Sequence, residues 1–255
     1  MFAYLAFENF SQELEKELRN KKAISDRLFV SETLQKCLWA QHTWLNCEII
    51  EINSVGDAVK ALKAKGKWWA LYSFDHHRRA QLIQEQLPKY KVPPLKFLGE
   101  LPSPAMGAWT LLEKNKILLS AETTSPFPLG EIHFQENKEM PPSRAYLKLW
   151  EIFTVHKIVP KKGSVCLDLG SCPGGWTWAL QQAGAQVISV DKAPLDPKIA
   201  KLPNIEFRKK DAFALKPQEL GPIEWLFSDL ICYPPRLLEL VEDWRASGLC
   251  KNFVC

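Results

Sequence analysis

The chain has 255 residues, so at roughly 150 residues per domain it holds one large or two modest domains. It is 46% hydrophobic and 24% charged, with 12 Gly and 18 Pro, which excludes collagen, a disordered tail and a disulfide-rich miniprotein. The formal net charge of +4 is small, so charge alone does not indicate nucleic-acid binding.

The cysteines and the apolar runs indicate the environment of the protein. Seven cysteines are an odd number and no Cys-x-x-Cys pair occurs, which favours reduced thiols over a disulfide framework or a metal site such as zinc. The start, MFAYLAF, lacks a basic segment and predicts a strand rather than a signal peptide. No apolar run approaches the roughly 18 residues of a membrane span. We therefore expect a soluble, cytoplasmic protein without membrane or metal partners; its oligomeric state does not follow from the sequence.

Residues 1–87 have the pattern of a small α/β domain. The order of elements is strand, helix, strand, strand, helix, strand, which is typical of a ferredoxin-like unit. The expected elements are the strand Phe2–Phe7, a helix from Ser11, the strands Arg27–Val30 and Cys47–Ile52, the helix Val55–Ala64 and the strand Trp68–Phe74.

Residues 88–142 differ in composition, because PKYKVPPL, LPSPAMG, SPFPLG and EMPPS make this segment rich in proline. Clusters of proline and glycine are typical of loops and turns. Between these stretches, WTLLEKNKILLSA predicts a β-hairpin. We expect a connecting region with a little strand structure of its own.

From residue 143 to residue 255, strands and helices alternate, which predicts a parallel sheet covered by helices and hence a Rossmann-like α/β domain. A first helix is expected at Arg144–Val155, and Pro234 and Pro235 mark the start of a later one. The buried strands are expected at Val165–Leu169, Val187–Val190, Ile205–Phe207 and Trp225–Ser228.

The segment after the first of these strands indicates a ligand site. The strand ends at Gly170, and the turn Ser171–Gly175 leads into a helix. Glycines let the backbone approach a ligand closely, and N–H groups at a helix start can bind polar ligand atoms. The spacing is not G-x-G-x-x-G, which disfavours a nicotinamide-dependent oxidoreductase.

Three acidic residues each follow one of the later strands. Asp191, Asp211 and Asp229 are expected at the carboxyl ends of parallel strands, where such sheets bind ligands. An acid at the position of Asp191 can accept both hydroxyls of an adenosine ribose. Alternatively, Asp191 and Asp211 are ordinary loop carboxylates.

The motifs LDLGSCPGGWTWAL, VISVDKAP, FRKKDAF and FSDL resemble those of the S-adenosylmethionine-dependent ribose 2′-O-methyltransferases of the FtsJ/RrmJ type. PSRAYLKLWEIF and WRASGLCKNF are similar to the RlmM family, which methylates a cytidine ribose of large-subunit (23S) ribosomal RNA. The resemblance covers residues 143–255, and SPFPLG and WAQHTWL are weaker echoes of the RNA-binding N-terminal region of that family. It implies a Rossmann-like methyltransferase that uses S-adenosylmethionine and acts on RNA, with residues 1–87 as a possible RNA-docking module.

The resemblance also implies the residues of the cofactor site. The loop that ends in Trp176 would wrap the methionine end of the cofactor, Asp191 would hold the ribose hydroxyls, and Asp211 would lie beside the adenine amino group. Asp229 would lie near the sulfonium. The full implied set is Gly170, Cys172, Pro173, Gly174, Gly175, Trp176, Asp191, Asp211 and Asp229.

The family uses a catalytic Lys-Asp-Lys-Glu set, in which Lys148 matches the first Lys and Asp229 the Asp. A ribose hydroxyl is a poor nucleophile at neutral pH, so a lysine must take its proton or stabilise the oxyanion. The second Lys and the Glu would lie beyond Asn252, and we expect both to be missing because the sequence stops at Cys255. The alternatives are a truncated or non-catalytic relative that binds S-adenosylmethionine or RNA, and a solvated role for Lys148.

Two further patterns leave alternatives open. Asp229-Leu-Ile-Cys232 is superficially similar to an Asp-x-Pro-Cys element of cytosine C5 methylation, but it lacks the proline, which favours a structural cysteine. Some of the ten tryptophans could stack RNA bases instead of packing in the core. Those considered for stacking are Trp39, Trp44, Trp68 and Trp69.

Overall fold

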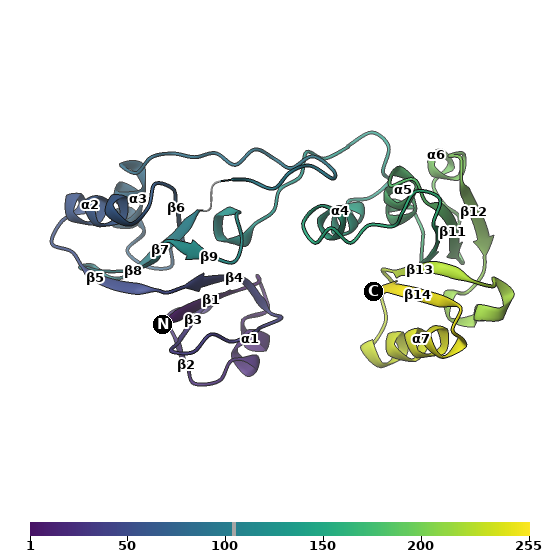
Figure 1. The fold of residues 1–255 in the computed structure, drawn as a ribbon, viewed down its shortest axis with the longest axis horizontal. Coiled ribbons are helices and arrows are strands. Elements are labelled where there is room, and N and C mark those ends of the chain that lie inside the picture. The colour runs from purple at the N-terminus through teal and green to yellow at the C-terminus, as the bar shows by residue number, and fades with distance from the viewer. Residues whose placement is uncertain (104–105) are drawn as a thin grey trace. The chain divides into compact units, whose positions relative to one another are not determined.

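The computed structural model describes residues 1–103 and 106–255 (Figure 1). Pro104 and Ala105, which fall in the expected proline-rich connection, lie outside the described residues. The chain forms two compact units: one comprises Met1–Leu95 and Leu101–His133, and the other comprises Lys96–Glu100 and Phe134–Cys255. Both units contain sheets and helices, so the predicted mixed α/β fold class is confirmed.

The first unit begins with a sheet in which β1 pairs antiparallel with β3 on one side and with β4 on the other. Helix α1 (Ser11–Glu17) connects β1 to β2. In spatial order the strands of this sheet are β2 (Lys21–Ala23), β3 (Leu28–Ser31), β1 (Phe2–Ala6), β4 (Ala40–Leu45) and β9 (Glu122–Thr123).

A second sheet of the first unit is built around the β7–β8 hairpin. In spatial order its strands are β5 (Glu48–Glu51), β8 (Lys116–Ser120), β7 (Gly107–Glu113) and β6 (Trp69–Leu71). Because side chains alternate along a strand, Trp109 and Leu111 pack with residues of helices α2 (Val55–Lys65) and α3 (His77–Glu85), while Ala108 packs with residues of the first sheet. The hairpin therefore lies between two hydrophobic cores.

The pairing in this unit differs from the expected ferredoxin-like arrangement. The strands expected at Phe2–Phe7 and Arg27–Val30 lie in the first sheet, whereas those at Cys47–Ile52 and Trp68–Phe74 contribute to the second. The hairpin expected in a connecting region at 88–142 supplies the two central strands of the second sheet, so the first unit extends to His133. Hydrophobic periodicity is local and does not record which strand pairs with which.

The second unit contains a five-stranded sheet in which every neighbouring pair is parallel. This is the Rossmann-like arrangement predicted from the alternation of strands and helices. In spatial order the strands are β12 (Ile205–Lys209), β11 (Gln186–Asp191), β10 (Val165–Leu169), β13 (Ile223–Ser228) and β14 (Cys250–Val254).

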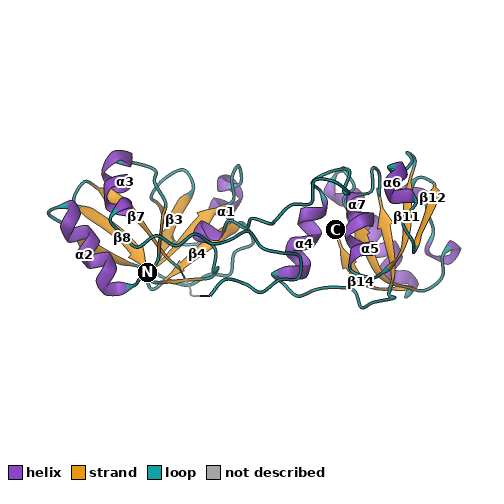
Figure 2. Cartoon of the chain, turned by 90° about the horizontal axis from the view of Figure 1, so that it is seen from above, coloured by secondary structure: helices purple, strands orange, loops and turns teal. Residues whose placement is uncertain are grey.

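Helices cover both faces of this sheet (Figures 1 and 2). Residues of α4 (Tyr146–Thr154) and α5 (Gly175–Gln182) form one hydrophobic core with the sheet, and residues of α7 (Pro234–Ser247) form another. In α4, positions 146, 149, 150 and 153 are buried, which is the spacing of one helical face. The remaining short elements are α6 (Pro197–Ala200) and the 3₁₀ turns Pro128–Gly130, Ala212–Ala214 and Pro217–Glu219.

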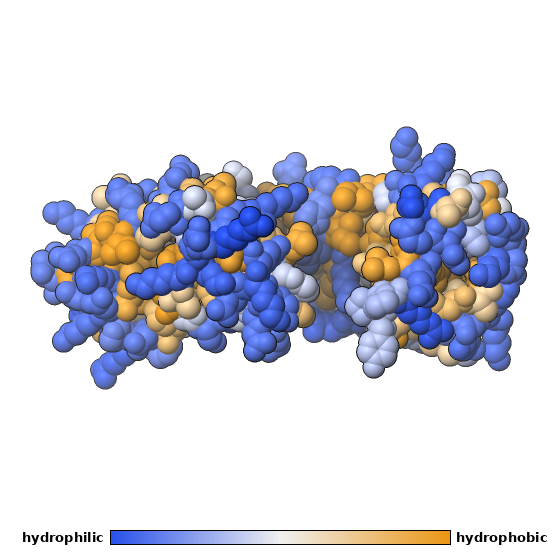
Figure 3. Space-filling view, turned by 90° about the horizontal axis from the view of Figure 1, so that it is seen from below, coloured by the Kyte–Doolittle hydropathy of each residue, from blue (hydrophilic) through white to orange (hydrophobic). Residues whose placement is uncertain are grey.

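The face drawn in Figure 3 carries mostly polar residues, with apolar residues in several separate areas. In the described part of the chain, every helix is too short or too polar to cross a lipid bilayer.

The central place of the hairpin predicts a large effect of Trp109→Ala. The Trp109 side chain is fully buried, and its Nε1 donates a hydrogen bond of 2.8 Å to Oε1 of Gln84 in α3. We expect a loss of about 3–5 kcal/mol in the free energy of unfolding, measured by urea titration. Trp39→Ala, at a site 39% exposed, is the control and is expected to cost about 1 kcal/mol or less. Equal small losses in both variants would contradict the assignment of the hairpin to the core.

Candidate cofactor and catalytic site

Three strands of the parallel sheet end at the same level. Leu169 of β10 pairs with Val190 of β11 on one side and with Ser228 of β13 on the other. The residues that come next along these strands, and so lie together at the carboxyl edge of the sheet, are Gly170, Asp191 and Asp229.

The loop between β10 and α5 requires glycine at two positions. Gly170 and Gly174 have φ angles of +79° and +114°, which residues with a Cβ atom rarely adopt. A Cβ atom on Gly170 would lie 2.5 Å from Cδ2 of Leu230, and one on Gly174 would lie 3.0 Å from Cγ2 of Ile199. Between these glycines, the Cys172–Pro173 peptide is cis. The backbone of the loop thus occupies a place where a side chain would not fit.

Asp191 holds this loop in position. Its Oδ2 accepts a hydrogen bond of 3.0 Å from the N–H of Cys172, and its Oδ1 accepts one of 2.9 Å from the N–H of Ala193. A carboxylate has about four acceptor positions. The two backbone contacts therefore leave Asp191 able to accept hydrogen bonds from a ligand.

Asp211 follows β12 and is kept in its anionic form. Its Oδ1 accepts a hydrogen bond of 3.0 Å from the N–H of Phe213, and its Oδ2 lies 2.8 Å from Nζ of Lys192. The hydrogen bond from Lys192 is the main cause that holds the pKa of Asp211 below its ordinary value, and the N–H of Phe213 acts in the same direction. The carboxylate can therefore accept a hydrogen bond from an amino group of a ligand at neutral pH.

Lys148 and Asp229, the two expected catalytic residues, are in direct contact. Nζ of Lys148 in α4 donates hydrogen bonds of 2.7 and 2.8 Å to the two carboxylate oxygens of Asp229, just after β13. The Lys148 side chain is 61% exposed and that of Asp229 is 36% exposed, so the pair is open to a substrate.

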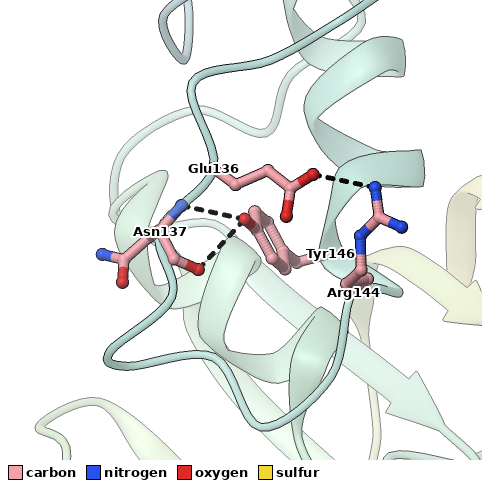
Figure 4. Close-up of polar contacts among 4 residues, drawn as sticks. All are labelled: Glu136, Asn137, Arg144 and Tyr146. Atoms are coloured by element: carbon pink, nitrogen blue, oxygen red, sulfur yellow. Dashed lines mark hydrogen bonds and ion pairs between the residues drawn. The ribbon is translucent and has the colours of Figure 1, made fainter.

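A set of polar contacts holds the start of α4 in place (Figure 4). The Tyr146 hydroxyl accepts a hydrogen bond of 3.0 Å from the N–H of Asn137 and donates one of 3.2 Å to its carbonyl. Arg144 forms an ion pair of 2.8 Å with Glu136. These contacts join the segment before α4 to the helix, two residues before Lys148.

The side chain of Trp176 packs into the core beside the loop. It is only 6% exposed, its Nε1 donates a hydrogen bond of 3.0 Å to the carbonyl of Ala145, and its ring packs edge-on against Phe227. The Trp176 side chain therefore joins α5 to the residue that precedes α4, a supporting contact that the motif did not predict, and its cofactor contact stays a prediction.

A buried polar group that the sequence motifs did not indicate lies beneath the loop. Asp168 is 1% exposed and accepts a hydrogen bond of 2.6 Å from Oγ1 of Thr177, which also lies 2.8 Å from Oγ of Ser189. Burial raises the pKa of Asp168 to about 7. The available signal was an acidic residue inside an otherwise apolar strand, because such a residue must find partners in the core.

Two buried hydroxyls at the same edge were also missed. Oγ of Ser171, in the loop, and Oγ of Ser228, at the end of β13, have no hydrogen-bond partner among the described residues. Buried polar atoms are nearly always paired, so unpaired hydroxyls beside a glycine loop are typical of a surface that a ligand completes.

The structure also bears on the other candidates for function, which are metal ligands and tryptophans that could stack RNA bases. Among residues 1–103 and 106–255 there is no group of three His, Cys, Asp or Glu side chains placed to hold a metal ion. Trp44 and Trp69 are buried, Trp68 packs against Tyr90, and Trp39 is partly exposed. Only Trp39 and Trp68 therefore keep some surface for stacking.

The raised pKa of Asp168 predicts a pH-dependent stability. Between about pH 4 and pH 7 the folded chain keeps a proton on Asp168 that the unfolded chain loses, so this contribution is present at low pH and disappears as the pH rises through about 7. We expect the free energy of unfolding of the wild type to fall relative to Asp168→Asn across this range, by up to roughly 4 kcal/mol. Urea titrations at a series of pH values measure the difference, and Asp243→Asn on exposed α7 is the control. Parallel pH profiles of the wild type and Asp168→Asn would contradict the assignment.

Comparison with known proteins finds relatives of the part of the chain that carries this site. Residues 141–252 match the family model described as FtsJ-like methyltransferase. A protein named Ribosomal RNA large subunit methyltransferase M from Laribacter hongkongensis is 33% identical over 150 residues, which cover 55% of this chain and 42% of that protein. Proteins of the same name from Aromatoleum aromaticum and Shewanella sp. (strain MR-4) are 37% and 29% identical, over 44% and 69% of this chain and 32% and 47% of their own lengths. The chain spans less than half the length of these curated relatives.

Solved structures are less similar. A putative hemolysin from Lactococcus lactis is 23% identical, with a TM-score of 0.38 over 42% of this chain and 54% of that chain. Because this TM-score is below 0.5, the fold assignment depends on the strand order of the chain itself. The match over residues 141–252 confirms the resemblance inferred from the motifs, so this part of the second unit is similar to the FtsJ-like methyltransferases.

Proposed function

We propose that the chain transfers a methyl group from S-adenosylmethionine to a ribose 2′-hydroxyl of RNA, with large-subunit (23S) ribosomal RNA as the substrate. The observation that carries this proposal is the Lys148–Asp229 pair, which lies at the same sheet edge as the glycine loop and Asp191. Ribosomal RNA as substrate also places the protein in the cytoplasm.

The residues at the edge fit an adenosine-containing cofactor. Asp191 keeps acceptor positions for two ribose hydroxyls, and anionic Asp211 suits the adenine amino group. The backbone of 170–175 and the unpaired hydroxyls of Ser171 and Ser228 offer polar contacts. S-adenosylmethionine, when bound, supplies a methyl group on a positively charged sulfur, and the carboxylate of Asp229 favours that charge at this edge.

Lys148 is suited to act on the ribose hydroxyl. An ammonium group has three N–H donors, and the contacts to Asp229 leave at least one of them for the 2′-oxygen. This donor orients the hydroxyl for in-line attack and stabilises the negative charge that grows on the oxygen. The oxygen–methyl bond forms as the sulfur–methyl bond breaks, and the hydroxyl proton passes to solvent, to which the pair is open. Asp229 fixes the direction of Lys148 and is the positioning partner in this step.

The first unit is proposed to dock the RNA. Its support is an exposed aromatic pair, Phe10 and Trp39, whose rings stack with centroids 4.8 Å apart and are 42% and 39% exposed. Lys67 lies 4.6 Å from the centre of the Trp68 ring. Aromatic faces next to lysines are typical of surfaces that bind single-stranded nucleic acid.

Two variants separate cofactor binding from turnover. Asp191→Ala removes the ribose acceptor and a loop contact, and we expect the Kd for S-adenosylmethionine to rise about 10- to 1,000-fold. Lys148→Ala is expected to leave that Kd within about twofold and to lower kcat about 100- to 10,000-fold. Calorimetry gives the Kd, and transfer of a tritiated methyl group to ribosomal RNA gives kcat.

Lys161→Ala, an exposed lysine before β10, is the control and should change neither quantity. Equal losses of cofactor affinity in Asp191→Ala and Lys148→Ala would refute the division of roles. Cofactor binding by the wild type without methyl transfer would favour the alternative of a protein that binds S-adenosylmethionine or RNA without catalysis.

A further inference from the structure

The segment that follows Asp229 exposes two apolar side chains beside the catalytic pair. Ile231 and Tyr233 are 104% and 85% exposed, and among the described residues they are the two most exposed large hydrophobic side chains. Leu230, which follows Asp229, instead packs against Gly170 and fills the space that a Cβ atom on that glycine would need. Exposed apolar groups gathered at one place are typical of a binding surface.

The backbone of this segment is fixed at both ends. Leu230 packs against the core that lies beneath α7. At the other end Tyr233 precedes Pro234 and Pro235, whose rings restrict φ, and its carbonyl accepts a hydrogen bond of 3.0 Å from the N–H of Arg236. The backbone therefore holds Tyr233 in place while its ring stays in solvent, and little ordering is required when a partner binds.

Two cationic side chains belong to the elements next to Tyr233. Arg236 is exposed one helical turn after Tyr233, and its guanidinium lies 3.8 Å from the centre of the Phe213 ring. Lys148 is paired with Asp229, which precedes Tyr233 by four residues. An exposed aromatic face on a segment that has cations before and after it suits the bases and phosphates of a single-stranded nucleic acid better than an apolar protein surface.

We propose that Ile231 and Tyr233 form a stacking platform for an unpaired RNA base next to the ribose that is methylated. This inference rests on the proposed function. When the methylated ribose belongs to an unpaired nucleotide, the neighbouring base has lost part of its stack, and an aromatic side chain can replace the lost base neighbour. The Tyr233 ring supplies the stacking face, Ile231 supplies an apolar contact, and Arg236 supplies charge for the neighbouring phosphate.

The test measures RNA binding by the full chain in the presence of S-adenosylhomocysteine. The probe is a short single-stranded RNA with a terminal fluorescein and one 2-aminopurine, whose emission falls when it stacks on an aromatic ring. Tyr233→Ala is expected to raise the Kd for RNA about 5- to 150-fold, to abolish the change in 2-aminopurine emission, and to leave the Kd for S-adenosylmethionine unchanged. Tyr233→Phe keeps the ring and is expected to behave as the wild type.

Ile158→Ala is the matched control, since Ile158 is 47% exposed in the segment between α4 and β10. The platform would be overturned if Tyr233→Ala bound RNA with the affinity and the emission change of the wild type. It would also be overturned if Ile158→Ala lost as much RNA affinity as Tyr233→Ala, or if the wild type bound no RNA. Methyl transfer with an unchanged KM for RNA in Tyr233→Ala would overturn the platform and leave the proposed function standing. RNA binding that needs Tyr233 in a chain that transfers no methyl group would support the platform and overturn the proposed function.

Discussion

The contact between Lys148 and Asp229 joins two elements that are 81 residues apart in the sequence, and the chemistry assigned to this chain depends on it. Both side chains are partly exposed, so their attraction is screened by water and adds little to stability. The contact persists because the helix and the strand that carry the two residues are held in place by the hydrophobic core. The buried face of α4 packs on the sheet, and Asp229 directly follows a strand in the middle of that sheet.

The same core also fixes the cofactor loop. α5 begins at Gly175, where a Cβ atom would lie 2.7 Å from Oγ of Ser143, and the next residue, Trp176, donates its hydrogen bond to Ala145. The loop that would hold the cofactor and the helix that carries Lys148 are therefore parts of one packed assembly. In the proposed function, this geometry would hold the groups around the methyl donor and those around its acceptor at a constant distance, which methyl transfer requires.

The sequence predicted the second unit well because each of its signals is local. Buried parallel strands are rich in apolar residues. Asp191 ends β11, Asp229 directly follows β13, and Asp211 comes two residues after β12. The two sheets of the first unit were not predicted, because β5 pairs with β8 and β6 with β7 across long stretches of sequence. The burial of Trp176 and the hydrogen bonds of Asp168 depend on packing, which neither motif nor spacing records.

The position of the transferred methyl group tests the central claim most directly. Ribosomal RNA is incubated with the chain and isotopically labelled S-adenosylmethionine, digested to nucleosides, and analysed by mass spectrometry. Methylation by the Lys148–Asp229 pair predicts a labelled nucleoside that carries the methyl group on its ribose. A label on a base, or no label from a chain that binds the cofactor, would contradict it.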